Sequence, residues 1–494
     1  METIKLNQGN LSRIQKNASV PGYDRKNLLP EIVHIGLGNF HRAHQASYLD
    51  KLLEKGLEKS GIFEINLIPD AAFPIANILS GQDNLYTLIT KSPGGESNVR
   101  ISGSILGYLN AAANKKAALE RIADDRTSLV TLTVTEGGYY YKKKTNEIDT
   151  RDPAVLRDLE NPEEPKTAAA VLAAALALRY KSGKRPLTIM SCDNIPSNGK
   201  VLENCVGFFC RELYPDICPW VKDQVSFPCS MVDRITPVTT GALIRELEDN
   251  YGISDLWPVC GEDFIQWVLE DNFRTRVPRY GEAGVQIAGD VEPYELMKMR
   301  LLNGSHSAMS YPSYLLGLRM VDEGINHPLI RSFIREHYME EATPTLSPVP
   351  GIDLTVYKDT LVSRFSNKNI ADTILRLNSE GSSKLPNFML KPLSEAIRKG
   401  LPHDAFIFAL ASWARFLEGK DEQGKPIPIE DINGPAITAK ASKAATDPEG
   451  FLSAAGLEGL NSEQMKTTSE KFRTWLETIH KKGIKRALEE FLKK

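Results

Sequence analysis

The sequence predicts an α/β protein in which a Rossmann-type domain with a mostly parallel sheet, residues 1–290, precedes an α-helical domain, residues 291–494. Short apolar runs rich in β-branched residues alternate with helical patterns in the first part, which is typical of a parallel sheet with crossover helices. Beyond about residue 290 the apolar residues recur at i, i+3 and i+4, which indicates successive helices. A chain of 494 residues also exceeds one ordinary core.

The composition is that of a globular protein without a strong field of either sign. Hydrophobic residues make up 41% and charged residues 25%, and the formal net charge is -3. We therefore expect small molecules, rather than nucleic acid or a membrane surface, as partners. The sequence leaves the oligomeric state open, and a monomer is compatible with it.

Three features bear on the cellular location. The longest apolar run, residues 167–178, is too short to span a membrane, and residues 1–6 lack the apolar core of a signal peptide. The six cysteines form no Cys-x-x-Cys pair, so we expect free thiols in a reducing compartment. A cytoplasmic location is the expectation.

A glycine turn follows the first predicted strand, residues 32–35, and precedes a predicted helix, residues 43–55. In this arrangement the N–H groups at the start of the helix bind a dinucleotide's pyrophosphate. The predicted cofactor contacts are Ile35, Gly36, Gly38, Asn39, Phe40, His41 and Arg42. His41 stands where the usual fingerprint has its third glycine, so the helix cannot pack as closely. A glycine turn without a ligand is the alternative.

The second predicted strand, residues 63–68, ends near the place of a dinucleotide's adenosine ribose. An acidic residue there usually accepts from the ribose 2′-OH and repels a 2′-phosphate. Asp70 is the candidate, which favours NAD over NADP. A turn-forming or helix-capping aspartate is an equally good interpretation.

Two later strands, residues 128–135 and 187–192, are predicted to flank a helix, residues 167–181. Open α/β sheets bind ligands at the carboxyl ends of their strands, so Asn194 is expected to face a cofactor. The alternative for Asn194 is an Asx turn. Asp233, next to Arg234 in a short apolar run, is a candidate for binding a ligand hydroxyl, and a structural ion pair is its alternative.

A helical stretch, residues 295–316, carries polar side chains among apolar ones. On a wheel of about 100° per residue, Glu295, Lys298 and His306 fall within about 80°, and Asn303 lies about 60° beyond. If this face is buried, Lys298 loses solvation as an ammonium ion, which lowers its pKa toward that of a general base for an alcohol. Alternatively, Lys298 extends to water with Glu295 as its surface partner, and His306 is a core histidine.

A flexible loop, residues 379–386, is predicted in the second domain and carries Lys384, with Arg376 shortly before it. Loops often carry function, although a loop lysine usually serves solubility. No His-Glu-x-x-His or phosphate-loop pattern occurs, and the His and Cys residues do not cluster at zinc spacing. No metal is expected, so the base and the oxyanion donors for an alcohol oxidation would be side chains.

Several motifs together resemble the polyol-specific long-chain dehydrogenases, over nearly the whole chain and in the family's order. They are residues 35–44 (IGLGNFHRAH), 135–139 (TEGGY), 190–194 (MSCDN), 231–237 (MVDRITP), 302–306 (LNGSH) with Lys298, and 381–384 (GSSK). Residues 348–355 and 364–367 resemble the mannitol branch of the family. Residues 66–69 resemble its fructuronate reductase branch.

The resemblance implies a zinc-independent secondary-alcohol dehydrogenase with a nicotinamide cofactor. D-Mannitol and D-fructose are the expected polyol and ketose, and fructuronate reduction or D-arabinitol oxidation are the alternatives. In this family the first domain binds the dinucleotide and the helical domain carries substrate binding and catalysis. The family's acidic discriminator falls at Ala71 or Ala72, slightly after Asp70, so NAD is expected with NADP as the alternative.

The resemblance also implies roles for site residues. Lys298 would be the general base, and Asn194 and Asn303 would hold the oxygen that becomes an alkoxide. The polyol's other hydroxyls would be bound by His306, Asp233, Arg376 and Lys384. Glu295 would tune the proton affinity of Lys298 or relay its proton.

Overall fold

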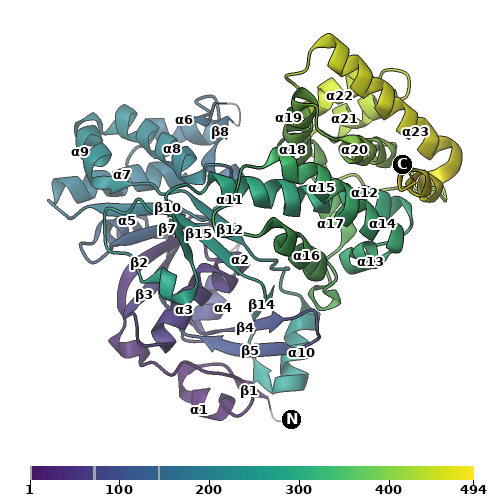
Figure 1. Ribbon diagram of the computed structural model, residues 1–494. Coiled ribbons are helices and arrows are strands. Elements are labelled where there is room, and N and C mark those ends of the chain that lie inside the picture. The colour runs from purple at the N-terminus through teal and green to yellow at the C-terminus, as the bar shows by residue number, and fades with distance from the viewer. Residues whose placement is uncertain (1–2, 70–73, 143–144, 494) are drawn as a thin grey trace. The chain divides into compact units, whose positions relative to one another are not determined.

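The computed structural model describes residues 3–69, 74–142 and 145–493. Contacts within the chain divide it into two compact units, Met1–Glu292 and Pro293–Lys494. Figure 1 colours the chain from purple in the first unit to yellow at the end of the second.

The centre of the first unit is a parallel sheet of six strands among the described residues, in the order β11-β10-β7-β2-β3-β6. Its strands are β2 (Leu29–Ile35), β3 (Ser60–Asn66), β6 (Ile105–Asn110), β7 (Leu129–Leu132), β10 (Leu187–Ser191) and β11 (Val225–Ser226). Numbered along the chain, the spatial order is 3-2-1-4-5-6, which is the doubly wound Rossmann order. The predicted α/β class is confirmed.

The sequence of the central strand β2 explains its place in the sheet. Val33 and Ile35 belong to the core on one face, and Ile32 belongs to the core on the other. Ile32 pairs with Leu129 of β7, and Ile35 pairs with Leu132. β-Branched side chains fit such a strand because both of its faces are buried.

Helices cover both faces of the main sheet (Figure 1). One face packs against α5 (Lys115–Ala123), α7 (Ala168–Lys181) and α8 (Asn198–Leu213), and the other against α3 (Gln45–Glu54) and α4 (Ile75–Ser80). Helix α7 begins one residue after the start of the predicted helix, because Thr167 is its N-cap and accepts from Ala170 N at 3.3 Å.

The first unit also contains smaller sheets. Their strands are β1 (Ile4–Lys5) with β13 (Ile253–Ser254); β4 (Tyr86–Lys91), β5 (Ser97–Ser102) and β14 (Val259–Glu262); β12 (Ser230–Asp233), β15 (Gln266–Glu270) and β16 (Gln286–Ala288); and the hairpin β8 (Tyr141–Lys142) and β9 (Glu147–Ile148). Asp233, a predicted site residue, is the last residue of β12.

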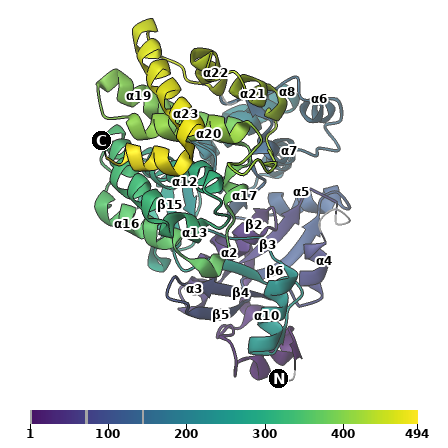
Figure 2. The same cartoon turned by 90° about the vertical axis from the view of Figure 1, so that its right-hand side faces the viewer.

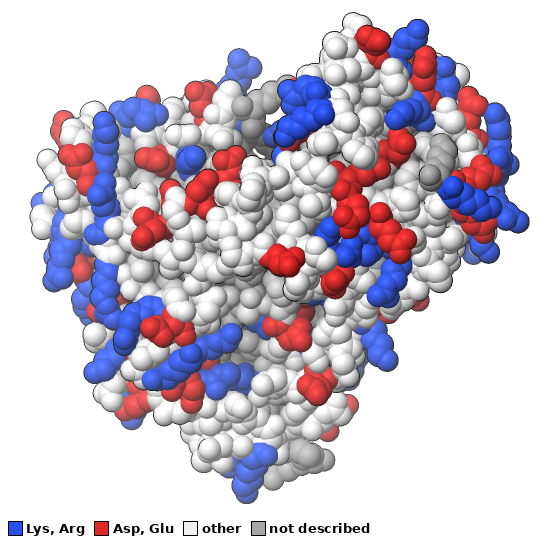
Figure 3. All heavy atoms as spheres, in the orientation of Figure 1, with Lys and Arg blue, Asp and Glu red and all other residues white. Residues whose placement is uncertain are grey.

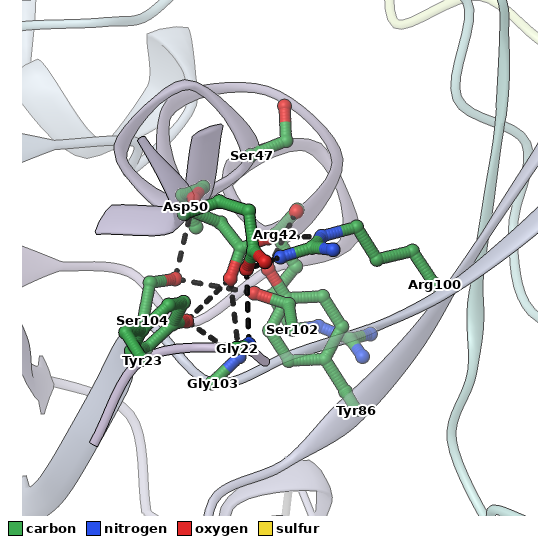
Figure 4. Close-up of polar contacts among 12 residues, drawn as sticks. Gly22, Tyr23, Arg42, Ser47, Asp50, Tyr86, Arg100, Ser102, Gly103 and Ser104 are labelled. Carbon is green, nitrogen blue, oxygen red and sulfur yellow. Dashed lines mark hydrogen bonds and ion pairs between the residues drawn. The ribbon is translucent and has the colours of Figure 1, made fainter. Parts of the chain in front are cut away.

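A largely buried ion pair joins α3 to β5 (Figure 4). Asp50 accepts from Tyr23 Oη at 2.5 Å and from Arg100 Nε at 2.5 Å. Its Oδ1 also accepts from Gly103 N at 3.3 Å. Arg100 donates to Glu54 as well, at 2.8 Å, but the Glu54 side chain is 40% exposed and that of Asp50 only 3%. The arginine therefore has one buried and one exposed carboxylate partner.

Replacing Asp50 by alanine is expected to lower the free energy of unfolding by about 3–5 kcal/mol, because it leaves charged and hydroxyl partners unpaired inside the protein. Glu54→Ala is the matched control, since it removes the exposed partner of the same arginine, and we expect at most about 1 kcal/mol. Urea unfolding followed by circular dichroism measures both. Equal losses for the two variants would contradict the role given to burial.

The second unit is α-helical, as predicted (Figure 2). Its helices are α11 (Glu292–Met297), η6 (Lys298–Asn303), α12 (Gly304–Leu315), α13 (Val321–Asn326), α14 (Pro328–Ser332), η7 (Phe333–Tyr338), α15 (Met339–Ala342), α16 (Leu354–Phe365), α17 (Ile374–Asn378), α18 (Gly381–Leu385), η10 (Pro386–Leu390), α19 (Lys391–Lys399), α20 (Asp404–Leu417), α21 (Gly434–Ala441), α22 (Pro448–Ala455) and α23 (Ser462–Phe491). The buried helix α20 packs between α12 and α23.

The flexible loop predicted at residues 379–386 is wrong, because residues 381–385 form α18. Glu380 begins it with φ 55°. Ser382 N donates to Asp431 Oδ2 at 2.7 Å, which satisfies an N–H of the first turn. Gly381 fits closely, since a Cβ there would lie 2.8 Å from Tyr311 Oη and 2.9 Å from Trp413 Nε1. Tertiary contacts thus make a helix of a stretch whose composition favours a loop.

Charged side chains of both signs are intermixed on the face shown in Figure 3. This agrees with the small net charge of -3. Among the helices in the described part of the chain, none combines the length and the apolar character needed to cross a membrane.

Candidate active site

The glycine turn lies where the strand order of the main sheet reverses, between β2 and β7. Gly36 has φ 114°, and a Cβ there would come within 2.2 Å of Thr133 O, so only glycine fits. Gly38 is the N-cap of α2 (Asn39–Ala43), and the nearest atom to a Cβ there would be Gly36 O at 3.9 Å. This open approach to the start of a helix fits a dinucleotide's pyrophosphate.

His41, at the position of the missing third glycine, packs inward. It is 1% exposed and stacks on His34 with ring centroids 3.4 Å apart. His41 Nε2 lies 2.9 Å from Glu64 Oε1. His34 Nε2 in turn lies 3.1 Å from Gly36 O and 2.9 Å from Thr133 Oγ1. The stacked imidazoles fill the space between the helix and the strand, and His34 contacts the glycine turn at Gly36 O.

The carboxyl group of Glu64 makes stability depend on pH. Burial raises the pKa of Glu64 from 4.5 to about 7, although His34 and Arg42 oppose the shift. The folded state therefore holds this proton more tightly than the unfolded chain does. The contribution of Glu64 to stability is fully present below pH 4.5 and is lost as the pH rises to about 7.

Glu64→Gln stays neutral at every pH and removes this loss. Relative to the parent protein, the variant is expected to gain up to about 3 kcal/mol of unfolding free energy between roughly pH 4.5 and 7.5. Urea unfolding of both proteins across that range measures the gain. A stability difference that stays constant with pH would exclude the assigned titration.

Asn39 and Arg42 connect the turn to neighbouring segments of the first unit. Asn39 Nδ2 donates to Thr239 Oγ1 at 3.0 Å, and Asn39 Oδ1 accepts from Arg42 Nη2 at 2.7 Å. Arg42 is fully buried, donates to Trp257 O at 2.6 Å and lies over the Tyr86 ring. Both side chains hold the turn in place, and their contact with a cofactor stays a prediction.

The remaining residues predicted at the cofactor are placed in different ways. Ile35 is the buried last residue of β2, and half-buried Phe40 stacks on His44 with centroids 4.9 Å apart. Asp70 lies outside the described residues, as do Ala71 and Ala72.

Asn194 lies beyond the carboxyl end of one strand of the first unit, and Asp233 lies at the carboxyl end of another. Asn194 follows β10 and is exposed, and Asp233 ends β12 and is 3% exposed. Asn198 Nδ2 donates to Asp193 O at 3.0 Å and to Ser230 O at 2.8 Å, which brings the two segments together. The hydrogen bonds of Asn198 thus join the segment after β10 to the start of β12.

Lys298 and Asn303 begin and end a π-helix, η6. The sequence predicted a plain α-helix, in which residues five apart point about 140° away from each other. A π-helix forms i→i+5 hydrogen bonds, as Gly304 N to Met299 O shows. Its wider turn brings Lys298 and Asn303 toward a common face. Single π turns inside helices are frequent at functional sites.

The polar face of this stretch is buried, which excludes a lysine that extends to water. Lys298 is 7% exposed, and Glu295 and His306 are 8% exposed. The His306 ring lies 4.1 Å from that of Phe365. Asn303 Nδ2 is buried and, within the described ranges, has no hydrogen-bond partner. An unpaired buried donor has a cost, so a ligand atom that accepts from it would be favoured.

Arg376 and Lys384 are neighbours in the second unit. Arg376, at α17, pairs with Asp372 through its Nε at 2.6 Å and through its Nη2. Half-buried Lys384 lies on α18, with Nζ 3.5 Å from Ser379 Oγ. Burial lowers the pKa of Lys384, and the positive charge of Arg376 acts in the same direction.

Sequence reasoning missed two buried polar side chains. Asn378, 5% exposed, has neither carboxamide atom in a hydrogen bond with any residue that the structure describes. Its only signal was a polar residue at the end of an apolar helix. Asp193, 8% exposed, accepts three hydrogen bonds through its carboxylate. It was visible beside Asn194, but an Asx turn explains the same pattern.

Two family models match the chain. The mannitol dehydrogenase Rossmann domain matches residues 30–281, and the mannitol dehydrogenase C-terminal domain matches residues 290–480. Mannitol 2-dehydrogenase from Aspergillus fumigatus is 38% identical over 504 aligned residues, with all of both chains covered. The enzyme of that name from Phaeosphaeria nodorum is 39% identical over 493 residues, covering 99% of this chain and 86% of the relative.

Two solved structures are similar over nearly the full length. The ternary complex of Pseudomonas fluorescens mannitol 2-dehydrogenase with NAD and D-mannitol is 38% identical, with a TM-score of 0.89 and coverage of 99% of this chain and 100% of that one. A substrate-free D-sorbitol dehydrogenase is 34% identical, with a TM-score of 0.89 and coverage of 98% and 100%. On this evidence, the chain belongs to the mannitol dehydrogenase family.

Proposed function

We propose that this chain oxidises D-mannitol at C2 to D-fructose with NAD, and catalyses the reverse reduction, without a metal ion. The observation that carries this proposal is the π-helix, whose wider turn brings buried Lys298 toward the face of Asn303. Among the described residues, the Asn303 Nδ2 donor has no hydrogen-bond partner. A base and a hydrogen-bond donor on one face suit the removal of a proton from an alcohol oxygen.

Lys298 takes the proton of the C2 hydroxyl. Burial favours the neutral amine over the ammonium ion, and the neutral form has the lone pair that accepts a proton. Asn303 and Asn194 donate hydrogen bonds to the oxygen as it becomes an alkoxide, which replaces the Lewis acid of a metal-dependent dehydrogenase. NAD, when bound, supplies the hydride acceptor. The glycine turn at Gly36 and Gly38 would hold its pyrophosphate.

Further polar side chains orient the rest of the polyol. We assign His306, Asp233, Arg376 and Lys384 to its other hydroxyls, and Glu295 to tuning Lys298 or relaying its proton. A fixed orientation selects which secondary alcohol reacts. The complex of the P. fluorescens enzyme with NAD and D-mannitol supports this substrate and NAD rather than NADP. A cytoplasmic location remains the expectation from the sequence.

D-Sorbitol is the second candidate substrate, because a D-sorbitol dehydrogenase is 34% identical and shares the fold at a TM-score of 0.89. Sorbitol and mannitol differ only in the configuration at one carbinol carbon. That carbon is C2, the one that reacts, so discrimination between them depends on how C2 and its hydroxyl are presented to Lys298 and to NAD.

A grid of initial rates tests the proposal. Reduction of NAD or NADP is followed by absorbance with mannitol, sorbitol, arabinitol and mannonate, and the ketose is identified by chromatography. We expect the highest kcat/KM with mannitol and NAD, and fructose as product. A preference for mannonate would instead support the fructuronate reductase branch, and preference for sorbitol or arabinitol would reassign the polyol.

A further inference from the structure

The carboxylate of Asp193 holds the loop that follows β7. Its two oxygens accept from Val134 N at 3.0 Å and from Thr135 N at 2.9 Å. A third hydrogen bond comes from Tyr139 Oη at 2.7 Å, and that hydroxyl also lies 2.6 Å from Ser191 Oγ. Asp193 is 8% exposed, so these bonds form in a largely water-free region where each is strong.

The held loop has a strained backbone. Thr135 has φ 64° and ψ 163°, a region that is essentially restricted to glycine. A threonine stays there only where surrounding contacts fix it. The two bonds from the backbone N–H groups of Val134 and Thr135 to Asp193 are contacts of that kind.

The backbone of Asp193 is fixed from the other side as well. Its carbonyl accepts from Ile195 N at 2.9 Å and from Asn198 Nδ2 at 3.0 Å. Asn198 is itself held by Ser230, whose N donates to Asn198 Oδ1 at 2.9 Å. Asn194 therefore follows a residue that is tied through its side chain to the loop after β7 and through its carbonyl to β12.

We propose that Asp193 is a positioning residue, whose carboxylate clamps the strained loop after β7 against the end of β10 and thereby fixes the backbone that presents Asn194. The inference rests on the proposed role of Asn194 as a donor to the alkoxide. The amide of Asp193→Asn has one acceptor oxygen in place of two and turns an NH2 group toward a backbone N–H. The loop then relaxes and Asn194 moves.

Asp193→Asn is expected to lower kcat for mannitol oxidation roughly 10- to 100-fold with little change in KM for NAD, since small misplacements of a catalytic group have effects of this size. The matched control is Asp158→Asn. Asp158 is also a fully buried carboxylate that accepts from backbone N–H groups, those of Lys166 and Thr167. That control should lower the melting temperature and leave kcat unchanged.

Two further variants separate positioning from simple structural support. In an Asn194→Ala background, Asp193→Asn should cost little additional kcat, because the group it positions is gone. Adding Thr135→Gly to Asp193→Asn should restore part of kcat, because glycine adopts the strained conformation without help. With mannitol deuterated at C2, the primary isotope effect on kcat should be larger for Asp193→Asn than for the parent protein, because hydride transfer becomes slower.

The outcomes distinguish a failure of the positioning role of Asp193 from a failure of the proposed function. If the parent protein oxidises mannitol and Asp193→Asn keeps its kcat, the positioning role is overturned while the proposed function stands. A fully additive loss in the Asn194→Ala background, or no rescue by Thr135→Gly, also overturns it. A parent protein inactive toward every polyol in the grid removes the proposed function itself.

Discussion

Replacing Lys298 by alanine is expected to lower kcat for mannitol oxidation by about 10²- to 10⁴-fold, the usual contribution of a general base. The residue is 7% exposed, so its amine meets the substrate hydroxyl without competing water. NAD affinity should be unchanged, because Lys298 is not among the residues that we assign to the cofactor. Stopped-flow absorbance gives kcat, and titration of protein fluorescence gives the dissociation constant of NADH.

Lys358 provides the control for this prediction. It is 4% exposed and donates to Glu340 Oε1 at 2.7 Å, so it is a buried lysine of the same unit with a structural partner. Lys358→Met should lower the melting temperature and keep kcat. Primary alkylamines should restore part of the activity of Lys298→Ala and none in the control. Unchanged turnover in Lys298→Ala would refute the assigned base.

Removing the carboxamide of Asn303 is expected to lower kcat by about 10²- to 10³-fold, as the loss of one oxyanion donor does. The Nδ2 atom is buried and, among the described residues, has no hydrogen-bond partner. Its hydrogen bond to the alkoxide therefore forms without breaking another bond. Steady-state kinetics with mannitol and NAD measure Asn303→Ala, and the melting temperature checks that the variant is folded.

Asn303→Asp distinguishes a donor from a packing residue. Aspartate has nearly the same shape as asparagine, so a packing role predicts a milder effect for it than for alanine. A donor role predicts the reverse order, since a carboxylate accepts hydrogen bonds and repels a developing alkoxide. An Asn303→Asp variant faster than Asn303→Ala would exclude the donor role.

The first unit shows which predictions from sequence succeed. The strand and glycine turn were visible in the sequence because β-branched runs and glycines report local backbone requirements. The absence of the third glycine, considered alone, suggested only that the helix packs less closely against the strand. His41 fits there only because His34 and Glu64, from two strands, meet it inside the protein. No local pattern reports such a meeting.

The helical unit shows where sequence patterns fail. An apolar period of about 3.6 residues located the helix around Lys298 but not the π turn within it. Likewise, the composition of residues 379–386 favours a loop, while packing against Tyr311 and Trp413 makes part of it α18. At α18, tertiary contacts outweigh a local preference of a few tenths of a kcal/mol per residue, roughly the scale of helix propensity.

The sequence by itself determined the fold class, the position of the glycine turn and the family of this protein, because these depend on periodicity and on motifs in a fixed order. The tertiary structure decided that Lys298 is buried, that the helix from Lys298 to Asn303 is a π-helix, and that Asn303 Nδ2 has no partner among the described residues. It also decided that Asp193 accepts hydrogen bonds from a strained loop. Burial and hydrogen-bond satisfaction depend on which distant segments pack together, so they follow only from the folded chain.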